Sequence, residues 1–174
     1  MGVVKLVKKT EILGNKIVLL DNVQDPGNVG TIIRSALAFN VTTIVLSPDS
    51  VSLYNDKLIR STEGTIFNTN IVVMPLKDAI DKIHEKSLKV YYADMHASIN
   101  LDDADIKDYA LVLGSEGKGI SPYIKEIADY GINIPMNELC ESLNVSITGS
   151  IIMYKFRWWL WTIYILENLL ILMV

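Results

Sequence analysis

The stretch that decides the fold is KIVLLDNVQDPGNVGTIIRSA, residues 16–36. Residues 17–20 are continuously apolar, as is typical of a short strand buried on both faces of a parallel sheet. Pro26 and Gly27 mark a turn, and residues 31–39 carry apolar side chains at helical spacing. The stretch therefore predicts a strand that leads into a helix at the sheet edge where open α/β proteins bind ligands.

Two polar residues of this stretch, Asn28 and Arg34, are candidates for a site at that edge. Asn28 lies in the turn, and Arg34 lies about a turn and a half into the predicted helix. Both also have a purely structural explanation, in which Asn28 caps the helix and Arg34 is a solvated surface cation. The local sequence leaves the two readings open.

The rest of the chain repeats the alternation of strand and helix. Short apolar runs predict strands at residues 43–46, 71–74, 89–94, 109–113 and 131–134, and amphipathic or capped segments predict helices at 55–62 and 76–86. Residues 1–15 are expected to form a short basic strand or arm, and residues 100–108 an acidic loop. This alternation indicates a parallel sheet with helices on both faces. Connection rules alone predict that it is not knotted.

Two further polar stretches follow predicted strands: LGSEGKGIS, residues 113–121, and IPMNELCESLNV, residues 134–145. The glycine spacing of the first matches neither a P-loop nor a Rossmann turn. Gly114 permits close approach of a ligand to the backbone. Glu116 is placed either to pair with Arg34 or to interact with a helix N-terminus.

In the second of these stretches, Ser142 fits the N-cap of a helix. The apolar residues Ile134, Met136 and Leu143 fit either a hydrophobic core or contact with a purine ring.

The three stretches, in this order, resemble the three motifs of the SpoU family of RNA 2′-O-ribose methyltransferases, which are TrmH-like proteins of the SPOUT superfamily. The similarity runs from about residue 17 to residue 154. It implies a parallel α/β sheet flanked by helices, with a deep C-terminal trefoil knot, and a homodimer whose active site lies at the subunit interface.

The same resemblance implies a reaction. A methyl group would pass from S-adenosylmethionine, leaving S-adenosylhomocysteine, to a ribose 2′-hydroxyl of structured RNA, without a metal. The form of residues 25–30 favours rRNA over tRNA as the substrate. A non-catalytic RNA-binding or assembly protein that retains the methyltransferase fold is the alternative.

By resemblance, the catalytic residues are Asn28, Arg34, Glu116, Ser142 and Asn144, and the cofactor pocket is lined by Gly114, Ile134, Met136 and Leu143. The segment RSTEG, residues 60–64, resembles a loop on the RNA side of the site, with Arg60, Thr62 and Gly64 as its RNA-binding residues. A helix end capped by Gly64 explains the same segment. Because an arginine side chain stays protonated at ordinary pH, Arg34 is expected to stabilise the developing alkoxide and not to act as a base.

The composition limits which partners and which kinds of site are possible. The chain has 174 residues, the size of one domain, and a net charge of −4, so an RNA partner must be held by a local patch. Its one cysteine excludes an intramolecular disulfide, and its two histidines show no zinc-binding spacing. No secretory or myristoylation signal is present, which favours a cytoplasmic protein without stable membrane association. His96 is interpreted as a surface residue outside the site.

The predicted organisation has three parts. Residues 1–15 form a short basic arm, too short for a separate RNA-binding domain; residues 16–154 form the methyltransferase domain; and residues 155–174 form an atypical apolar tail with three tryptophans. The tail is slightly short for a membrane span. It is either a genuine extension, buried against the partner subunit or another apolar surface, or the product of a shifted reading frame.

Overall fold

The computed structural model describes residues 9–157. The apolar tail from residue 158 onward and residues 1–8 of the basic arm lie outside the described residues. Residues 9–15 form neither strand nor helix, so the predicted first strand is not found in this part of the arm. Within residues 9–157, no helix is both long enough and apolar enough to span a membrane.

Within residues 9–157, seven strands form one sheet in the order β3-β2-β1-β6-β4-β7-β5. They are β1 (Lys16–Asp21), β2 (Thr43–Leu46), β3 (Ile71–Val73), β4 (Val90–Ala93), β5 (Ile99–Asn100), β6 (Tyr109–Gly114) and β7 (Tyr130–Asn133). Every pairing is parallel, which confirms the predicted parallel sheet. The central strands β1 and β6 pair from Lys16 with Tyr109 to Asp21 with Gly114. The loops that leave their carboxyl ends therefore start side by side.

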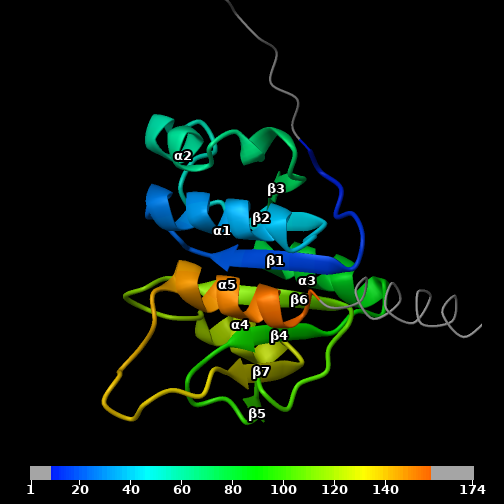
Figure 1. Cartoon of the computed structure of the whole chain (residues 1–174). Coiled ribbons are helices and arrows are strands. Elements are labelled where there is room, and N and C mark those ends of the chain that lie inside the picture. Colours follow the sequence, from blue (N-terminus) through cyan, green and yellow to red (C-terminus); the bar gives the residue numbers. More distant parts are fainter. Residues whose placement is uncertain (1–8, 158–174) are drawn as a thin grey trace, which may run out of the picture.

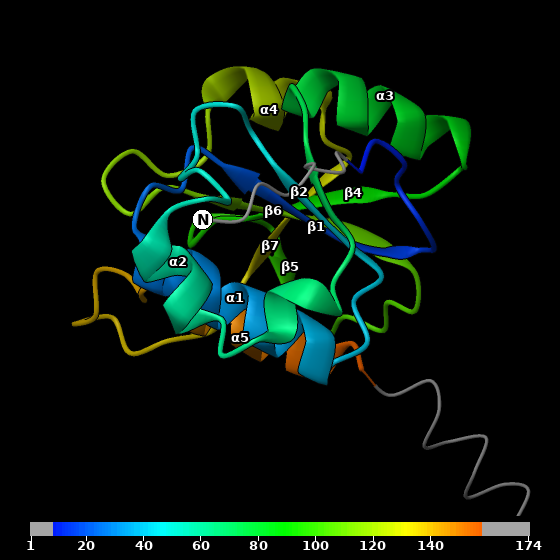
Figure 2. The same ribbon diagram turned by 90° about the horizontal axis from the view of Figure 1, so that it is seen from above.

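Helices cover both faces of the sheet (Figures 1 and 2). The helices α1 (Pro26–Ala38), α2 (Asp56–Ser61) and α5 (Val145–Lys155) lie on one face with the short 3-10 helix η1 (Thr65–Phe67). The helices α3 (Leu76–Glu85) and α4 (Pro122–Ile127) lie on the other. The predicted helices and strands are thus largely confirmed. At most of their ends, the predicted and observed bounds differ by no more than one or two residues.

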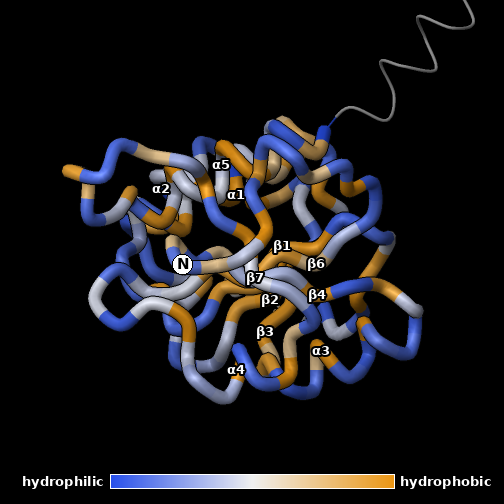
Figure 3. The backbone as a smooth tube through the Cα atoms, turned by 90° about the horizontal axis from the view of Figure 1, so that it is seen from below, coloured by the Kyte–Doolittle hydropathy of each residue, from blue (hydrophilic) through white to orange (hydrophobic). Residues whose placement is uncertain are grey.

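Alternate side chains of the central strands serve two separate cores. Val18 and Leu20 pack under α1 and α5, whereas Ile17 and Leu19 pack under α3 and α4. All four are fully buried. This explains why residues 17–20 are continuously apolar, and Figure 3 shows the hydrophobic strands between more mixed helices.

The ends of α1 and α5 differ from the predictions. Asp25, not Asn28, caps α1, because its carboxylate accepts a hydrogen bond from the backbone N–H of Asn28 at 2.9 Å. Asn144, not Ser142, caps α5 through bonds from the N–H groups of Ser146 and Ile147. The backbone N–H of Asn28 and the side chain of Asn144 therefore each take part in capping a helix start.

Candidate active site

Three residues from distant parts of the chain meet beyond the carboxyl ends of β1 and β6. Asn28 lies in the first turn of α1, Glu116 in the loop after β6, and Asn144 at the start of α5. Glu116 Oε1 accepts hydrogen bonds from Asn28 Nδ2 at 2.5 Å and from Asn144 Nδ2 at 2.6 Å. Asn144 Nδ2 also donates to Asn28 Oδ1 at 3.1 Å. We refer to Asn28, Glu116 and Asn144 as the Asn–Glu–Asn cluster.

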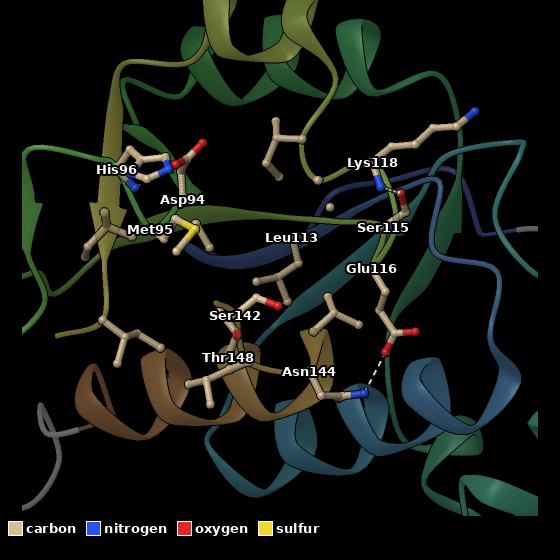
Figure 4. Close-up of a pocket in the computed structure, with 18 of the residues that line it drawn as sticks. Asp94, Met95, His96, Leu113, Ser115, Glu116, Lys118, Ser142, Asn144 and Thr148 are labelled. Carbon is tan, nitrogen blue, oxygen red and sulfur yellow. Dashed lines mark hydrogen bonds between the residues drawn. The ribbon is translucent and has the colours of Figure 1, made fainter. Parts of the chain in front are cut away.

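The orientation of the Asn144 amide follows from its two roles. Its Oδ1 accepts from the Ser146 N–H at 2.9 Å and from the Ser146 hydroxyl at 2.6 Å. Its Nδ2 is thereby turned toward Glu116, as Figure 4 shows. A carboxylate that accepts two amide donors on one oxygen keeps its other oxygen for a further partner.

A cavity of about 550 Å³ opens beside this cluster. All four residues predicted for the cofactor line it: Gly114, Ile134, Met136 and Leu143. Of the predicted catalytic residues, Glu116, Ser142 and Asn144 line it as well. Its volume is within the range of small-molecule sites, about 300–1,000 Å³.

Gly114 has a structural role in addition to its place in the cavity lining. A Cβ at Gly114 would lie 2.3 Å from the carbonyl group of Gly119 and 2.5 Å from the nitrogen of Ile120. The space is taken by the loop's own backbone as it folds back over the end of β6. Gly114 is therefore required for this loop to close, and the closed loop presents Glu116.

Polar residues after β4 complete the cavity and were not predicted. Asp94 accepts a hydrogen bond from the Lys125 ammonium and, at 2.8 Å, from the N–H of His96. Partial burial raises the pKa of Asp94, but these hydrogen bonds and the charge of Lys125 outweigh it, so the pKa lies below its usual value. His96 is exposed at the surface, as predicted, and it also lines the cavity with Asp94 and Lys125. The position of Asp94 and His96 just after β4, a strand of the same parallel sheet, was the signal that could have found them, whereas Lys125 lies in α4.

A second hollow of about 300 Å³ adjoins the cavity. Its lining comes from the loop before α1 and the loop after β6: Asn22, Val23, Gln24, Asp25, Asn28, Ser115, Glu116, Gly117 and Lys118. Ser115, Glu116 and Lys118 line both spaces. Asn28 faces only the second hollow and Asn144 only the cavity, so the Asn–Glu–Asn cluster separates the two.

Arg34 is not part of this arrangement within one chain. Its Nη1 lies 3.1 Å from Glu63 Oε1 in an exposed ion pair, and it lines neither space. The expected pairing of Arg34 with Glu116 is wrong, because Glu116 binds the two asparagines instead. Six residues along a helix place Arg34 about 240° around the axis from Asn28, on the outer side of α1.

The predicted RNA-side residues also separate. Thr62 is fully buried, and its hydroxyl donates to the Ile59 carbonyl at 2.8 Å. Arg60 is exposed and pairs with Asp56 one helical turn earlier, and Gly64 has a left-handed φ of +84° with open space around it. Only Arg60 and Gly64 of the three are available to a partner at the surface.

No group of three histidine, cysteine or acidic side chains within residues 9–157 is arranged to hold a metal ion. What the site offers is a mixed apolar and polar cavity, an adjoining polar hollow, and a hydrogen-bonded carboxylate between them. Such an arrangement suits two organic ligands that meet at Glu116.

Comparisons with known proteins show that the chain is similar to RNA methyltransferases. The chain is 32% identical over 143 residues to the 23S rRNA guanosine 2′-O-methyltransferase RlmP of Bacillus subtilis, covering 82% of this chain and 58% of that protein. It is 34% identical over 148 residues to a 23S rRNA adenosine 2′-O-methyltransferase of Streptomyces laurentii, covering 83% and 55%. The chain thus spans a little more than half the length of these relatives.

Solved structures show the same fold. A TrmH-family RNA methyltransferase of Porphyromonas gingivalis has a TM-score of 0.79 at 30% identity, covering 86% of this chain and 62% of that one. The AdoMet complex of the SpoU methyltransferase AviRb from Streptomyces viridochromogenes has a TM-score of 0.76 at 26% identity, covering 84% and 58%. The SpoU rRNA Methylase family matches residues 15–154, and the chain belongs to this family.

Proposed function

We propose that the protein transfers a methyl group from S-adenosylmethionine to a ribose 2′-hydroxyl of structured RNA, with rRNA as the favoured substrate. The observation that carries this proposal is the Asn–Glu–Asn cluster between the cavity and the second hollow. The names of the two 23S rRNA methyltransferases support the choice of rRNA.

The cavity fits S-adenosylmethionine chemically. Ile134, Met136 and Leu143 offer aliphatic contact for a purine ring, and the paired charges of Asp94 and Lys125 lie among the polar lining for the amino-acid end. AdoMet is bound in the AviRb structure. The sulfonium supplies an activated methyl group, so the protein's task is to position the ribose hydroxyl and to stabilise the oxygen as its proton leaves.

In this proposal the Asn–Glu–Asn cluster forms the boundary between the bound cofactor and the bound RNA. In the reaction, a bond forms between the 2′-oxygen and the methyl carbon, the bond from that carbon to sulfur breaks, and the hydroxyl proton passes to water or to an RNA phosphate. A cation near the 2′-oxygen would stabilise the developing negative charge. Arg34 of the same chain is directed elsewhere, which raises the question of where this cation comes from.

A homodimer answers that question. Ile147, Ile151 and Tyr154 form an exposed apolar stripe on α5, at the spacing of one helix face. α5 packs beside α1, joined by a 2.7 Å hydrogen bond between Ser35 and Ser150 (Figure 1). Arg34 is exposed on the side of α1 that faces α2, across α1 from α5, so the proposed contact surface covers α5 and the outer side of α1. A second copy packed on this surface would bring its own Arg34 toward the first copy's site.

Mixing two inactive variants tests this arrangement. Arg34→Ala and Asn144→Ala are each expected to lack activity alone. When they are mixed and allowed to exchange subunits, half of the dimers carry one intact site, so activity should return to about a quarter of the wild-type value. Mixed variants that stay inactive, despite confirmed subunit exchange, would contradict a site shared between subunits.

We also propose that the chain ties the trefoil knot of its superfamily. In support, the chain leaves β7, which lies next to the edge strand β5, and α5 returns to pack on α1 and β6. Tracing the backbone of an experimental structure through residues 94–157 tests this directly.

The decisive test of function has two stages. Isothermal titration with S-adenosylmethionine should show binding, and ribose methylation mapped in RNA from cells with and without the protein should differ at one or a few positions. A folded protein that binds RNA but not S-adenosylmethionine would instead support the non-catalytic RNA-binding alternative.

A further inference from the structure

We infer that the second hollow receives the acceptor nucleotide and that Lys118 binds its phosphate. This inference rests on the proposed function and adds to it the residues that hold the RNA. No residue of this hollow except Asn28 and Glu116 was assigned a role by sequence.

The position of the hollow supports an acceptor site. The methyl donor and the ribose hydroxyl must meet, so the acceptor pocket must share a wall with the cofactor cavity. The second hollow does so at Ser115, Glu116 and Lys118. A nucleotide in the hollow would thus have Glu116 between its ribose and the cavity.

The charges around the hollow favour an anionic ligand at one point only. The Asp25 carboxylate caps α1 and lies 3.6 Å from the Lys57 ammonium, and the Glu116 carboxylate accepts two amide donors. Lys118 is the one cation in the lining, and no hydrogen bond or ion pair joins its ammonium to the described part of the chain. Figure 4 shows this side chain extending away from the centre of the cofactor cavity. A free ammonium in this position suits a phosphate.

The opposite wall carries amides. Gln24 Nε2 makes only long contacts, 3.3 Å to Asn22 Oδ1 and 3.5 Å to the Asp49 carbonyl. Its side chain is exposed, so it can exchange these contacts for a ligand. Carboxamides supply both donors and acceptors to the edges of unpaired bases. The hollow therefore combines a phosphate group at Lys118 with base or sugar contacts at Gln24.

The first test measures RNA affinity. The probe is a fluorescein-labelled single-stranded RNA decamer of mixed sequence, with S-adenosylhomocysteine present at saturation. For Lys118→Gln, affinity should fall at low salt, and the slope of log affinity against log salt should decrease in magnitude by about 0.7, the value for one phosphate contact to a single strand. The matched control is Lys82→Gln, an exposed lysine on α3 on the other face of the sheet, which should leave both values unchanged.

The second test fills the hollow. A Cβ added at Gly117 meets no atom within 4 Å, and the backbone there is not left-handed. Gly117→Phe should therefore fold normally while adding a ring at the lining. Single-turnover methyl transfer to total RNA purified from cells that lack the protein should drop by about a hundredfold, as expected for a misplaced acceptor. Gly117→Ala, the control, should lose far less.

The outcomes separate this inference from the proposed function. If the wild-type protein binds no S-adenosylmethionine, the proposed function fails. If it binds the cofactor, the inference alone is overturned by any of three results: decamer binding weaker than about 10⁻³ M, an unchanged salt slope in Lys118→Gln, or wild-type transfer rates in Gly117→Phe.

Discussion

Gly30 of the first motif is expected to be required for stability, because α1 and α2 touch there. A Cβ at Gly30 would lie 2.0 Å from Ser61 Oγ, 2.7 Å from Ser61 Cβ and 3.0 Å from the Ser61 carbonyl carbon. The Ser61 hydroxyl occupies this space while it donates to the carbonyls of Pro26 and Leu58. In Gly30→Ala, either Ser61 gives up these bonds or the helices separate.

The size of the effect follows from three contributions. Replacing a helical glycine by alanine stabilises by about 1 kcal/mol. Overpacking costs about 1–3 kcal/mol, and loss of the hydrogen bond to Pro26 costs about 1 kcal/mol. Gly30→Ala should thus lower the free energy of unfolding by about 1–3 kcal/mol.

Equilibrium urea unfolding, followed by far-ultraviolet circular dichroism, measures this change. The double variant Gly30→Ala/Ser61→Gly removes the two nearest atoms, so it should be more stable than the sum of the single changes by about 1 kcal/mol. Gly117→Ala serves as the control at a glycine with open space. A Gly30→Ala protein as stable as the wild type, or additive behaviour of the double variant, would refute the steric reasoning.

Three further predictions concern the site and the opposite end of the sheet. Arg34→Ala should lower the rate of single-turnover methyl transfer by at least about a hundredfold, the loss expected for one oxyanion donor. Its affinity for the cofactor, measured by calorimetry, should be unchanged. A near-normal rate of transfer would show that Arg34 has another role. Glu116→Gln should lower the rate of methyl transfer by at least about tenfold without unfolding the protein, because a neutral oxygen binds the two asparagine amides more weakly. Activity equal to that of the wild type would show that the Glu116 carboxylate is not needed between the two ligands. Asp129 is partly buried, which raises its pKa, but hydrogen bonds from Lys89, the Val90 N–H and His84 lower it overall below the usual value. The Asp129 carboxylate therefore contributes to stability above about pH 4, and this contribution is lost as the pH falls through its folded pKa. Asp129→Asn should lower the free energy of unfolding by about 1 kcal/mol at pH 7 and by less near pH 3. If urea unfolding shows a loss of stability that does not depend on pH, this assignment is wrong.

The sheet could be predicted from sequence wherever a strand is continuously apolar. Residues 17–20 and 109–113 are buried on both faces, so their composition alone distinguishes them from loops. The strand β5 and the helix α4 were missed for a different reason. β5 has two residues, too few for a periodic pattern to be recognised. α4 has six residues and no side-chain hydrogen bond at its N-cap, whereas α2, which is equally short, begins at the capping residue Asn55.

The site could be predicted only in part, because side-chain partners depend on helix phase and on tertiary contacts. Ser142, Glu116 and Asn144 could be placed near one another from the motifs, and all three line the cavity. The partner of Arg34 could not be predicted, since it is set by the packing of α2 on α1. The pairing of Asp94 with Lys125 joins residues 31 apart that no local pattern connects.

The Asn–Glu–Asn cluster also bears on when the candidate site can form during synthesis. Asn28 and Asn144 are separated by 116 residues, and the hydrogen bond between them forms only after α5 has docked beside α1. A nascent chain that has not yet released α5 from the ribosome lacks one wall of the cavity and cannot bind cofactor there. Contacts at such long sequence separation slow folding, because loop closure precedes the contacts that stabilise it. Cofactor that binds only after α5 has docked would then stabilise this arrangement by mass action, so α5 would be held in place by the ligand whose site it completes.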